Sequence, residues 1–226
     1  PVVHFNGTSS IMTNNVAPVA GATARTLFLA FVNGVTSASD GFRSVLLGWG
    51  DTFFLGYAYN VLLQSLATTS WFGNTLGTGF GTDIHGGGTS GFNYATNSYP
   101  TAEKTILTVN WNGTNTEQIW VNSKAYQPSA TTWVNTSGTG NGLRLGANYG
   151  SQGYFQGDIA EVLIFDSNLS VSEKKNVECY LSFKYLIGTE NAQDCGNTPL
   201  SISPAGPITL QQGDTLSFAA HGGVPP

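Results

Sequence analysis

The run at residues 157–185 constrains the fold of this chain more than any other stretch, because it predicts a buried strand followed by a capped helix. Residues 159–165 are apolar and include several β-branched side chains, a composition typical of a buried strand. Ser170 and Glu173 then have the spacing of a capping box, in which each side chain accepts a hydrogen bond from the backbone N–H of the other residue.

The predicted helix carries a narrow apolar stripe. Val177, Leu181 and Tyr185 recur every four residues, which places them on one side of a helix that docks on a sheet. Gly188 follows as the expected stop, since glycine readily adopts the left-handed conformation that ends many helices.

Turn signals divide the rest of the sequence into short segments. Asn-Gly pairs favour β-hairpins between apolar runs, and residues 105–111 and 118–121 flank one such pair at Asn112-Gly113. Many short strands with one late helix predict an antiparallel sandwich of jelly-roll type. The other strands that the sequence predicts are 26–32, 44–49, 53–59, 143–147 and 154–165.

The sequence G-D-I-A-E-V-L-I-F-D at residues 157–166, with C-Y-L-S-F-K-Y at residues 179–185, resembles the end of the laminin-G-like, concanavalin A-like domains that are common in bacterial surface proteins. The resemblance extends over roughly residues 1–188. It implies an all-β fold: a concanavalin A-like antiparallel β-sandwich (jelly roll) with one short C-terminal helix. It also implies a binding module, without naming a ligand. The earlier segments that match are 3–7, 24–31, 47–50 and 107–111.

Composition and charge exclude two broad classes. The chain carries eight Lys and Arg residues against thirteen Asp and Glu residues, a formal net charge of −5. Nucleic-acid binding needs a clustered cationic surface, and these few cations are scattered, so no nucleic-acid partner is expected. A run of about 18 apolar residues is also missing, so the chain is not expected to span a membrane.

Cys179 and Cys195 are the only cysteines, and they close a short loop from the helix to the segment that follows. We expect a disulfide, which would stabilise the fold by roughly 3 kcal/mol through loop closure. The alternative is two unrelated thiols, one of them buried. A disulfide implies an oxidising compartment, and so a secreted or cell-surface protein, bacterial by the resemblance.

The character of the sequence changes after Gly188. Residues 1–188 are predicted to form the laminin-G/concanavalin A-like domain, and residues 189–199 a polar linker. Residues 200–226 resemble the truncated start of an immunoglobulin-like module, which needs about seven strands to be complete. We therefore expect a larger multidomain surface or fibre protein, in which the rest of the chain could form a homo-oligomer.

No catalytic constellation is evident, so the chain is not expected to be an enzyme. Glycoside hydrolases of related fold carry paired carboxylates on one strand, about 5 Å apart in retaining enzymes, and no such pattern occurs. Glu161 stands alone in the terminal motif, and we expect it to bond the backbone or the helix region rather than act as an acid. A serine triad is not indicated either, because no G-x-S-x-G elbow precedes a helix.

A glycine-rich segment, Asp83-Ile84-His85-Gly86-Gly87-Gly88, is the candidate ligand-binding loop. Lectins of the broader fold hold sugars with an Asp, glycine N–H groups, an Asn and a stacking aromatic ring, and this chain could supply such a set. The alternative, and the simpler interpretation, is a long surface loop whose glycines allow turns. The predicted ligand-binding residues are Trp71, Asp83, His85, Gly87, Tyr94, Asn148 and Tyr149.

The tryptophans divide into two groups. Trp49, Trp111 and Trp120 lie in predicted strands and are expected in the core or on a sheet face. Trp71 and Trp133 lie in Thr- and Ser-rich loops, where an exposed ring is more useful for binding.

Calcium is the one cofactor that the resemblance suggests, since several relatives of the fold hold this ion at the sandwich rim. Calcium takes six to eight oxygen ligands. Asp158, with Asp40 or Asp51, could contribute to such a site, or Asp158 could simply cap local N–H groups. A D-x-D-x-D-G loop is missing, the metal stays unknown, and no other cofactor is expected.

Together these features predict a non-catalytic extracellular recognition domain that binds carbohydrate or acts in adhesion. Its partner would be an extracellular glycan or another cell-envelope ligand. Two alternatives stay open. The domain could be a structural spacer or oligomerisation module, or it could be the accessory domain of a polysaccharide-active enzyme.

Overall fold

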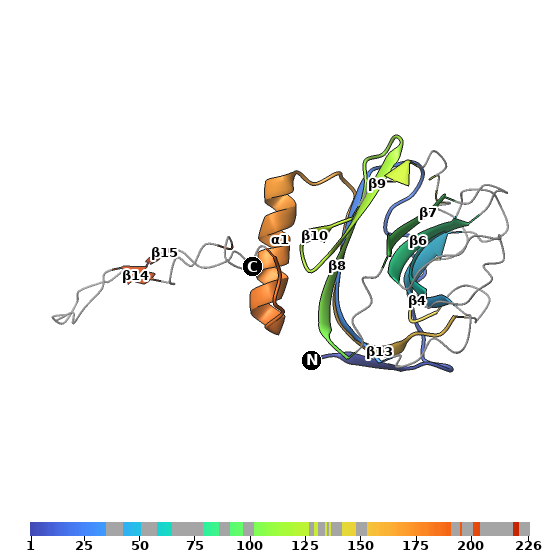
Figure 1. Cartoon of the computed structure of the whole chain (residues 1–226), viewed down its shortest axis with the longest axis horizontal. Coiled ribbons are helices and arrows are strands. Elements are labelled where there is room, and N and C mark those ends of the chain that lie inside the picture. The colour runs from blue at the N-terminus through green and yellow to red at the C-terminus, as the bar shows by residue number, and fades with distance from the viewer. Residues whose placement is uncertain are drawn as a thin grey trace.

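The fold is seen in a computed structural model of the chain (Figure 1). In the residues that the structure describes, all strand pairings are antiparallel and there is one α-helix. The residues that the structure describes are 1–34, 43–50, 58–64, 79–85, 91–96, 102–126, 129–130, 134, 136, 142–147, 153–190, 195, 201–203 and 219–221.

Two sheets face each other across a core. The seven-stranded sheet, here called the back sheet, has the strand order β1-β13-β3-β8-β9-β10, with β11 also paired to β9. All its pairings are antiparallel. Its strands are β1 (Val3–Asn6), β3 (Arg25–Asn33), β8 (Lys104–Trp111), β9 (Thr116–Val121), β10 (Lys124–Ala125), β11 (Ser129–Ala130) and β13 (Gln156–Phe165).

The six-stranded sheet, here called the front sheet, has the order β2-β12-β4-β5-β6-β7 and is likewise antiparallel. Strands β4 to β7 pair in chain order, whereas β12, which comes later in the chain, pairs with both β2 and β4. Its strands are β2 (Met12–Thr13), β4 (Arg43–Gly50), β5 (Ala58–Gln64), β6 (Gly79–His85), β7 (Gly91–Thr96) and β12 (Arg144–Leu145).

The core between the sheets is built by alternation along the strands, since every second side chain of a strand points to the same face. Leu27, Leu29 and Phe31 of β3 meet Leu47 and Trp49 of β4 in one buried apolar cluster. Trp111 is also fully buried there. The predicted antiparallel β-sandwich with one late helix is confirmed, and so is the core position of Trp49 and Trp111.

The helix α1 (Val171–Tyr185) lies on the outer face of the back sheet, on the side away from the front sheet (Figure 1). Its capping box is present: the Ser170 hydroxyl accepts from the Glu173 N–H, and the Glu173 carboxylate accepts from the Ser170 N–H. The Ser170 hydroxyl also donates to the Glu173 carboxylate at 2.7 Å, and this bond, together with the one from the Ser170 N–H, lowers the pKa of Glu173. The predicted stripe also holds, because Leu181 is fully buried against the sheet and Val177 and Tyr185 pack around it.

The C-terminal end of α1 differs from expectation. The helix ends at Tyr185, and Leu186, with φ 54° and ψ 54°, takes the left-handed conformation that we expected of Gly188. The Leu186 N–H still donates to the Ser182 carbonyl, so the cap forms without glycine. The reversal comes early because it returns Ile187 to the apolar cluster under the helix.

The disulfide between Cys179 and Cys195 is present, and it closes a loop of sequence separation 16. Cys179 belongs to α1, and Cys195 follows the end of the helix by ten positions in the linker. Both are buried. The linker is therefore attached covalently to the middle of the helix.

The strands between residues 53 and 96 differ in part from the prediction. Of the predicted strand 53–59, residues 58 and 59 belong to β5 (Ala58–Gln64), which pairs with β4 and continues to Gln64, and residues 53–57 lie outside the described part. Strands β6 and β7 were not predicted, because glycines interrupt the alternation of β6 and only pairing with β5 and β7 extends it. Asp83 and His85 therefore end a strand instead of opening a loop.

Beyond the linker, β14 (Ser201–Ser203) and β15 (Ala219–His221) pair antiparallel. The pairing agrees with a strand pattern in residues 200–226. The immunoglobulin-like module and the boundaries at 188 and 199 stay predictions.

Replacing the central docking residue of the helix tests how much the outer layer contributes to stability. Leu181→Ala should lower the free energy of unfolding by about 2–5 kcal/mol, because it opens a cavity at a fully buried position. Leu186→Ala makes the same substitution where the side chain is 80% exposed, and should change stability by less than about 0.5 kcal/mol. Urea unfolding followed by circular dichroism measures both, and equal losses would contradict the assignment of Leu181 as the docking residue.

Candidate functional site

The outer face of the back sheet is occupied by α1. Phe28 and Ala30 of β3, with Ile106 of β8, form a second buried cluster with Leu181 of the helix. The polar groups in this layer are also paired. The buried Glu178 carboxylate accepts from the Thr108 hydroxyl at 2.7 Å and from the Ser123 hydroxyl at 2.7 Å. This layer holds the helix in place and leaves the sheet beneath α1 closed to a ligand.

A β-bulge in β13 places Glu161 on the helix side. Ile159 pairs with Phe31 and faces the core, but the register shifts before Glu161, which pairs with Ala30. Without the extra residue Ala160, strict alternation would turn Glu161 into the core like Ile159. The bulge therefore turns the Glu161 carboxylate toward the helix and keeps it out of the core, within the mostly apolar second half of β13.

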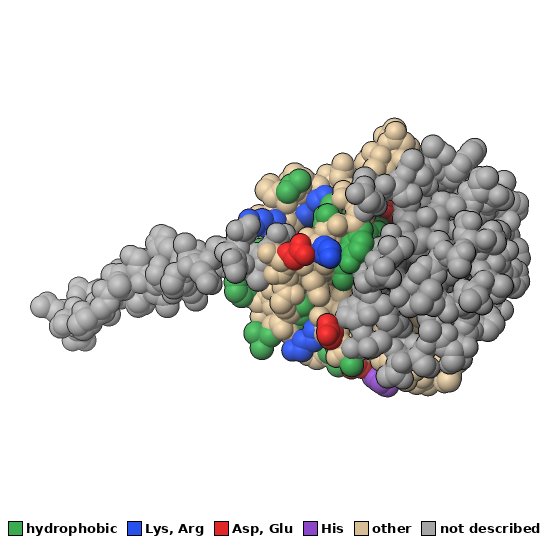
Figure 2. Space-filling model, viewed as in Figure 1, with side chains coloured by type: hydrophobic (Ala, Val, Ile, Leu, Met, Phe, Trp, Pro, Cys, Tyr) green, Lys and Arg blue, Asp and Glu red, His purple; other side chains and the backbone are tan. Residues whose placement is uncertain are grey.

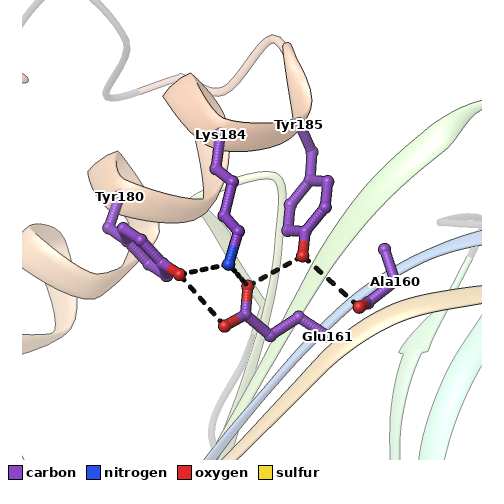
Figure 3. A network of polar contacts seen from close by, with 5 residues as sticks. All are labelled: Ala160, Glu161, Tyr180, Lys184 and Tyr185. Atoms are coloured by element: carbon purple, nitrogen blue, oxygen red, sulfur yellow. Dashed lines mark hydrogen bonds and ion pairs between the residues drawn. The ribbon is translucent and has the colours of Figure 1, made fainter. Parts of the chain in front are cut away.

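Glu161 is held by three side chains of α1 (Figure 3). Its carboxylate accepts from the Tyr180 hydroxyl at 3.1 Å, from Lys184 Nζ at 3.0 Å and from the Tyr185 hydroxyl at 2.9 Å. Lys184 also donates to the Tyr180 hydroxyl oxygen. The expectation that Glu161 bonds the helix region is confirmed, and its two oxygens are engaged in structural contacts.

This network shifts the protonation of its members. The bonds from Lys184 to Tyr180 and Glu161 raise the pKa of the Lys184 ammonium. Burial, together with the bond to Glu161, raises the pKa of the Tyr185 hydroxyl. Both groups are therefore held in their protonated forms in the folded protein.

Trp120 lies on the same side. Its ring is half-buried, and Lys174 Nζ of α1 sits 4.1 Å from the ring centroid. Burial lowers the pKa of Lys174, an effect that Glu178 partly opposes. Trp120 is thus a sheet-face residue under the first turns of the helix, as predicted, and it is not a free stacking platform.

Charge is divided between the two sheets. All five lysines belong to α1 or to strands of the back sheet, and the described surface over these elements shows scattered cations and carboxylates among apolar side chains (Figure 2). Arg25 of β3 is fully buried and donates to the Gly21 and Thr23 carbonyls. The remaining two cations, Arg43 and Arg144, lie on the front sheet.

Backbone register identifies the residues on the outer face of the front sheet, here called the front face. Leu47 and Trp49 point into the core, so Gly48 and Gly50 belong to the opposite face. Directly paired residues share a face, and the register runs from Arg144 through Gly48, Asn60 and Asp83 to Phe92 in one row across five strands.

Three of the predicted ligand residues fall on this face. Asp83 and His85 share it by alternation along β6, and Tyr94 shares it because it pairs with Gly81. Trp71, Gly87, Asn148 and Tyr149 lie outside the described residues, as does Trp133.

Asn60 and Arg144 share the front face but were not among the predicted residues. Asn60 lies between Gly48 and Asp83 in the row, and Arg144, half-buried, lies on the other side of Gly48. Both could have been found only with the correct limits of β5 and the return of β12 beside β4. Neighbouring strands are about 4.8 Å apart, so the row from Arg144 to Asp83 spans about 14 Å.

The metal prediction finds little support in the described part of the chain. Asp158 Oδ1 lies 2.7 Å from His4 Nδ1 on the neighbouring strand, and Asp40 and Asp51 fall outside the described residues. Among the residues that the structure describes, no three His, Cys, Asp or Glu side chains come together as a metal site. The search for a bilayer-spanning helix over those same residues also found none.

Comparison with known proteins agrees with this architecture. Residues 67–173 match the family described as the concanavalin A-like lectin/glucanases superfamily, from β6 to the first turn of α1. No curated protein sequence matches the chain.

Several solved structures share the fold at low sequence identity. The CBM40 of the Ruminococcus gnavus IT-sialidase, bound to α2,3-sialyllactose, aligns with TM-score 0.57 and 13% identity over 76% of this chain and 93% of its own. Domain 4 of the Geobacillus stearothermophilus arabinanase AbnA, in complex with arabinotriose, aligns with TM-score 0.51 and 16% identity over 76% and 73%.

A variant of the NanB sialidase of Streptococcus pneumoniae aligns with TM-score 0.57 and 15% identity over 76% of this chain. The alignment covers only 26% of that sialidase chain, so this chain spans about a quarter of it. At these identities the likeness shows the fold alone.

The Glu161 network predicts a pH-dependent contribution to stability. Glu161→Gln should lower the free energy of unfolding by about 1–3 kcal/mol at pH 7, since it removes the negative charge and one of the two oxygens that accept three hydrogen bonds. The pKa values of Lys184 and Tyr185 are raised on folding. Their contribution to stability is therefore complete below the unfolded values of 10.5 and 10.0, and it is lost progressively as the pH rises from those values toward the raised folded ones.

The stability difference between wild type and Glu161→Gln should therefore narrow above pH 10. Urea unfolding between pH 7 and pH 11 measures it. The exposed carboxylate of Glu103 offers a control, because Glu103→Gln should leave stability nearly unchanged across the range. If the difference in stability between wild type and Glu161→Gln stayed constant to pH 11, the predicted contribution of Lys184 and Tyr185 would be contradicted.

Proposed function

Because the chain carries a concanavalin A-like lectin/glucanase domain, we propose that this domain is a non-catalytic carbohydrate-binding module whose ligand binds across the front face. The observation that carries the proposal is the row in which Arg144, Asn60 and Asp83 share one sheet face by register. An amide, a carboxylate and a guanidinium in one row offer hydrogen-bond donors and acceptors to several sugar hydroxyls.

The arrangement of the two sheets supports this choice of face. α1 occupies the outer face of the back sheet, and the carboxylates of Glu161 and Glu178 are both engaged in holding it. The front face carries no such helix in the described part of the chain (Figure 1). A ligand that needs an extended polar surface would therefore bind to the front sheet.

The solved structures of similar fold add support at the level of ligand class. The CBM40 that aligns over nearly its whole length is bound to sialyllactose, and the arabinanase domain is in complex with arabinotriose. The first ligand is acidic and the second is neutral. We propose a glycan for this chain and leave its charge to experiment, since Arg144 favours a carboxylate and Asp83 favours neutral hydroxyls.

We also propose that the domain acts outside the cell, within a multidomain surface or fibre protein. The buried disulfide supports an oxidising compartment. The linker at 189–199 and the following β14–β15 pair support a second module. We propose further that the protein forms a homo-oligomer through the rest of its chain.

A second function, the accessory domain of a polysaccharide-active enzyme, is favoured by one observation. The match to the NanB sialidase covers a quarter of that chain, as expected of a module within a larger enzyme. Both functions require that this domain binds a glycan without hydrolysing it, whereas a spacer does not need to bind a glycan.

Asp83→Asn should weaken glycan binding by about 10- to 100-fold, because it replaces a charged acceptor of sugar hydroxyls, whose bonds contribute about 1.5–3 kcal/mol. A glycan array with neutral and acidic ligands would identify the best ligand, and titration calorimetry would measure its affinity for both proteins. Asp166→Asn is the matched control, since Asp166 is exposed at the end of β13 beside α1, and it should leave binding unchanged.

Three results would contradict the proposal. The wild-type chain could fail to bind any neutral or acidic glycan, which would favour the spacer. Release of reducing ends from a polysaccharide by the isolated chain would instead show that the domain is catalytic. Equal weakening by Asp83→Asn and Asp166→Asn would place the site away from the front face.

A further inference from the structure

The path of the chain after α1 is unusually constrained for a linker. Ile187 turns back into the cluster beneath the helix and is 4% exposed. Its N–H donates to the Ser182 carbonyl, and its carbonyl accepts from the Ser182 hydroxyl at 2.6 Å. The Glu190 N–H then donates to the Asn122 carbonyl at 2.9 Å, and Cys195 is bonded to Cys179.

These contacts meet at the turn between β9 and β10. Asn122 exchanges hydrogen bonds with the backbone of Ile106 on β8, through its N–H and its side-chain oxygen. Ser123 donates to Glu178, the residue before the disulfide cysteine. The turn therefore joins the back sheet, the middle of the helix and the linker at one place.

The disulfide offers a much shorter path for tension than the backbone does. The Cα atoms of Cys179 and Cys195 are 5.4 Å apart, whereas the chain between them could extend to about 55 Å for a separation of 16 residues. When the chain beyond residue 195 is pulled, the disulfide becomes taut first. Residues 180–194 then carry no load.

We propose that this disulfide makes the C-terminal end of the domain a mechanical anchor, which transmits tension to the middle of α1 and protects the end of the helix from peeling. Tension enters beside Glu178, whose carboxylate is buried and bonded to both β8 and the β9–β10 turn. Moving Cys179 therefore disturbs several buried contacts at once, and such cooperative rupture resists more force than sequential loss of single contacts.

Reduction changes the order of events. With two thiols in place of the bond, tension reaches Glu190 and Ile187 first, and then the last turn of the helix with Lys184 and Tyr185. These contacts form a short series that can break one after another. The anchor lies on α1, on the side of the sandwich away from the front sheet (Figure 1). Tension from the linker therefore enters the domain on the side opposite the front face.

Optical-tweezers pulling of the full chain from its two ends tests the proposal. The oxidised protein should show no rupture of α1 before the main unfolding step. After reduction by a phosphine, which converts the disulfide to two thiols and is itself oxidised, an added step at lower force should release up to about 50 Å. The N-terminal strand β1 bears the same force in the oxidised and the reduced protein. A difference between their force traces therefore reports on the C-terminal end of the domain.

The paired variant Cys179→Ser with Cys195→Ser should give the low-force step without reductant, and phosphine should not change it further. If this variant does not fold, reduction of the folded wild-type protein in the tweezers gives the same comparison. Oxidised and reduced chains with identical force traces, apart from the longer final extension, would overturn the proposal, since the noncovalent contacts of residues 180–190 would then suffice.

Discussion

Strand β3 is buried on both faces, and the arrangement of the two apolar layers depends on it. Leu27, Leu29 and Phe31 face the core between the sheets, whereas Phe28 and Ala30 face α1. A strand covered on both sides must sit in the middle of a sheet, and β3 pairs with β13 and β8 accordingly. The three strands together form a platform that supports the front sheet on one side and the helix on the other.

The two layers serve different purposes. The outer layer is closed by side chains that meet across it, including the bonds of Glu161 and Glu178 and the covalent attachment at Cys179. The carboxylates of Glu161 and Glu178 are both engaged in these contacts. Because α1 covers the back of the sandwich in this way, the proposed recognition surface is assigned to the front sheet, where backbone register places Asn60, Asp83 and Arg144 in one row.

The bulge in β13 shows how one inserted residue changes what a strand can do. Alternation assigns Ile159 and Glu161 to the same face, and Ala160 breaks that assignment. The core keeps Ile159, and the helix side gains Glu161 with its tyrosine and lysine partners. Sequence alone could indicate that Glu161 bonds the helix region through the family motif, but it could not show the rotation that makes those bonds geometrically accessible.

Local patterns in the chain specified the strand–helix run, the capping box at Ser170, the docking stripe through Leu181 and the hairpin at Asn112, because each depends on residues a few positions apart. The disulfide was inferable since the chain has only two cysteines. The limits of β5, the existence of β6 and β7 and the left-handed Leu186 were not, as each depends on a partner far away in the sequence. For the same reason Asp83 was recognised but misplaced in a loop, and only strand pairing assigned it a face with Asn60 and Arg144.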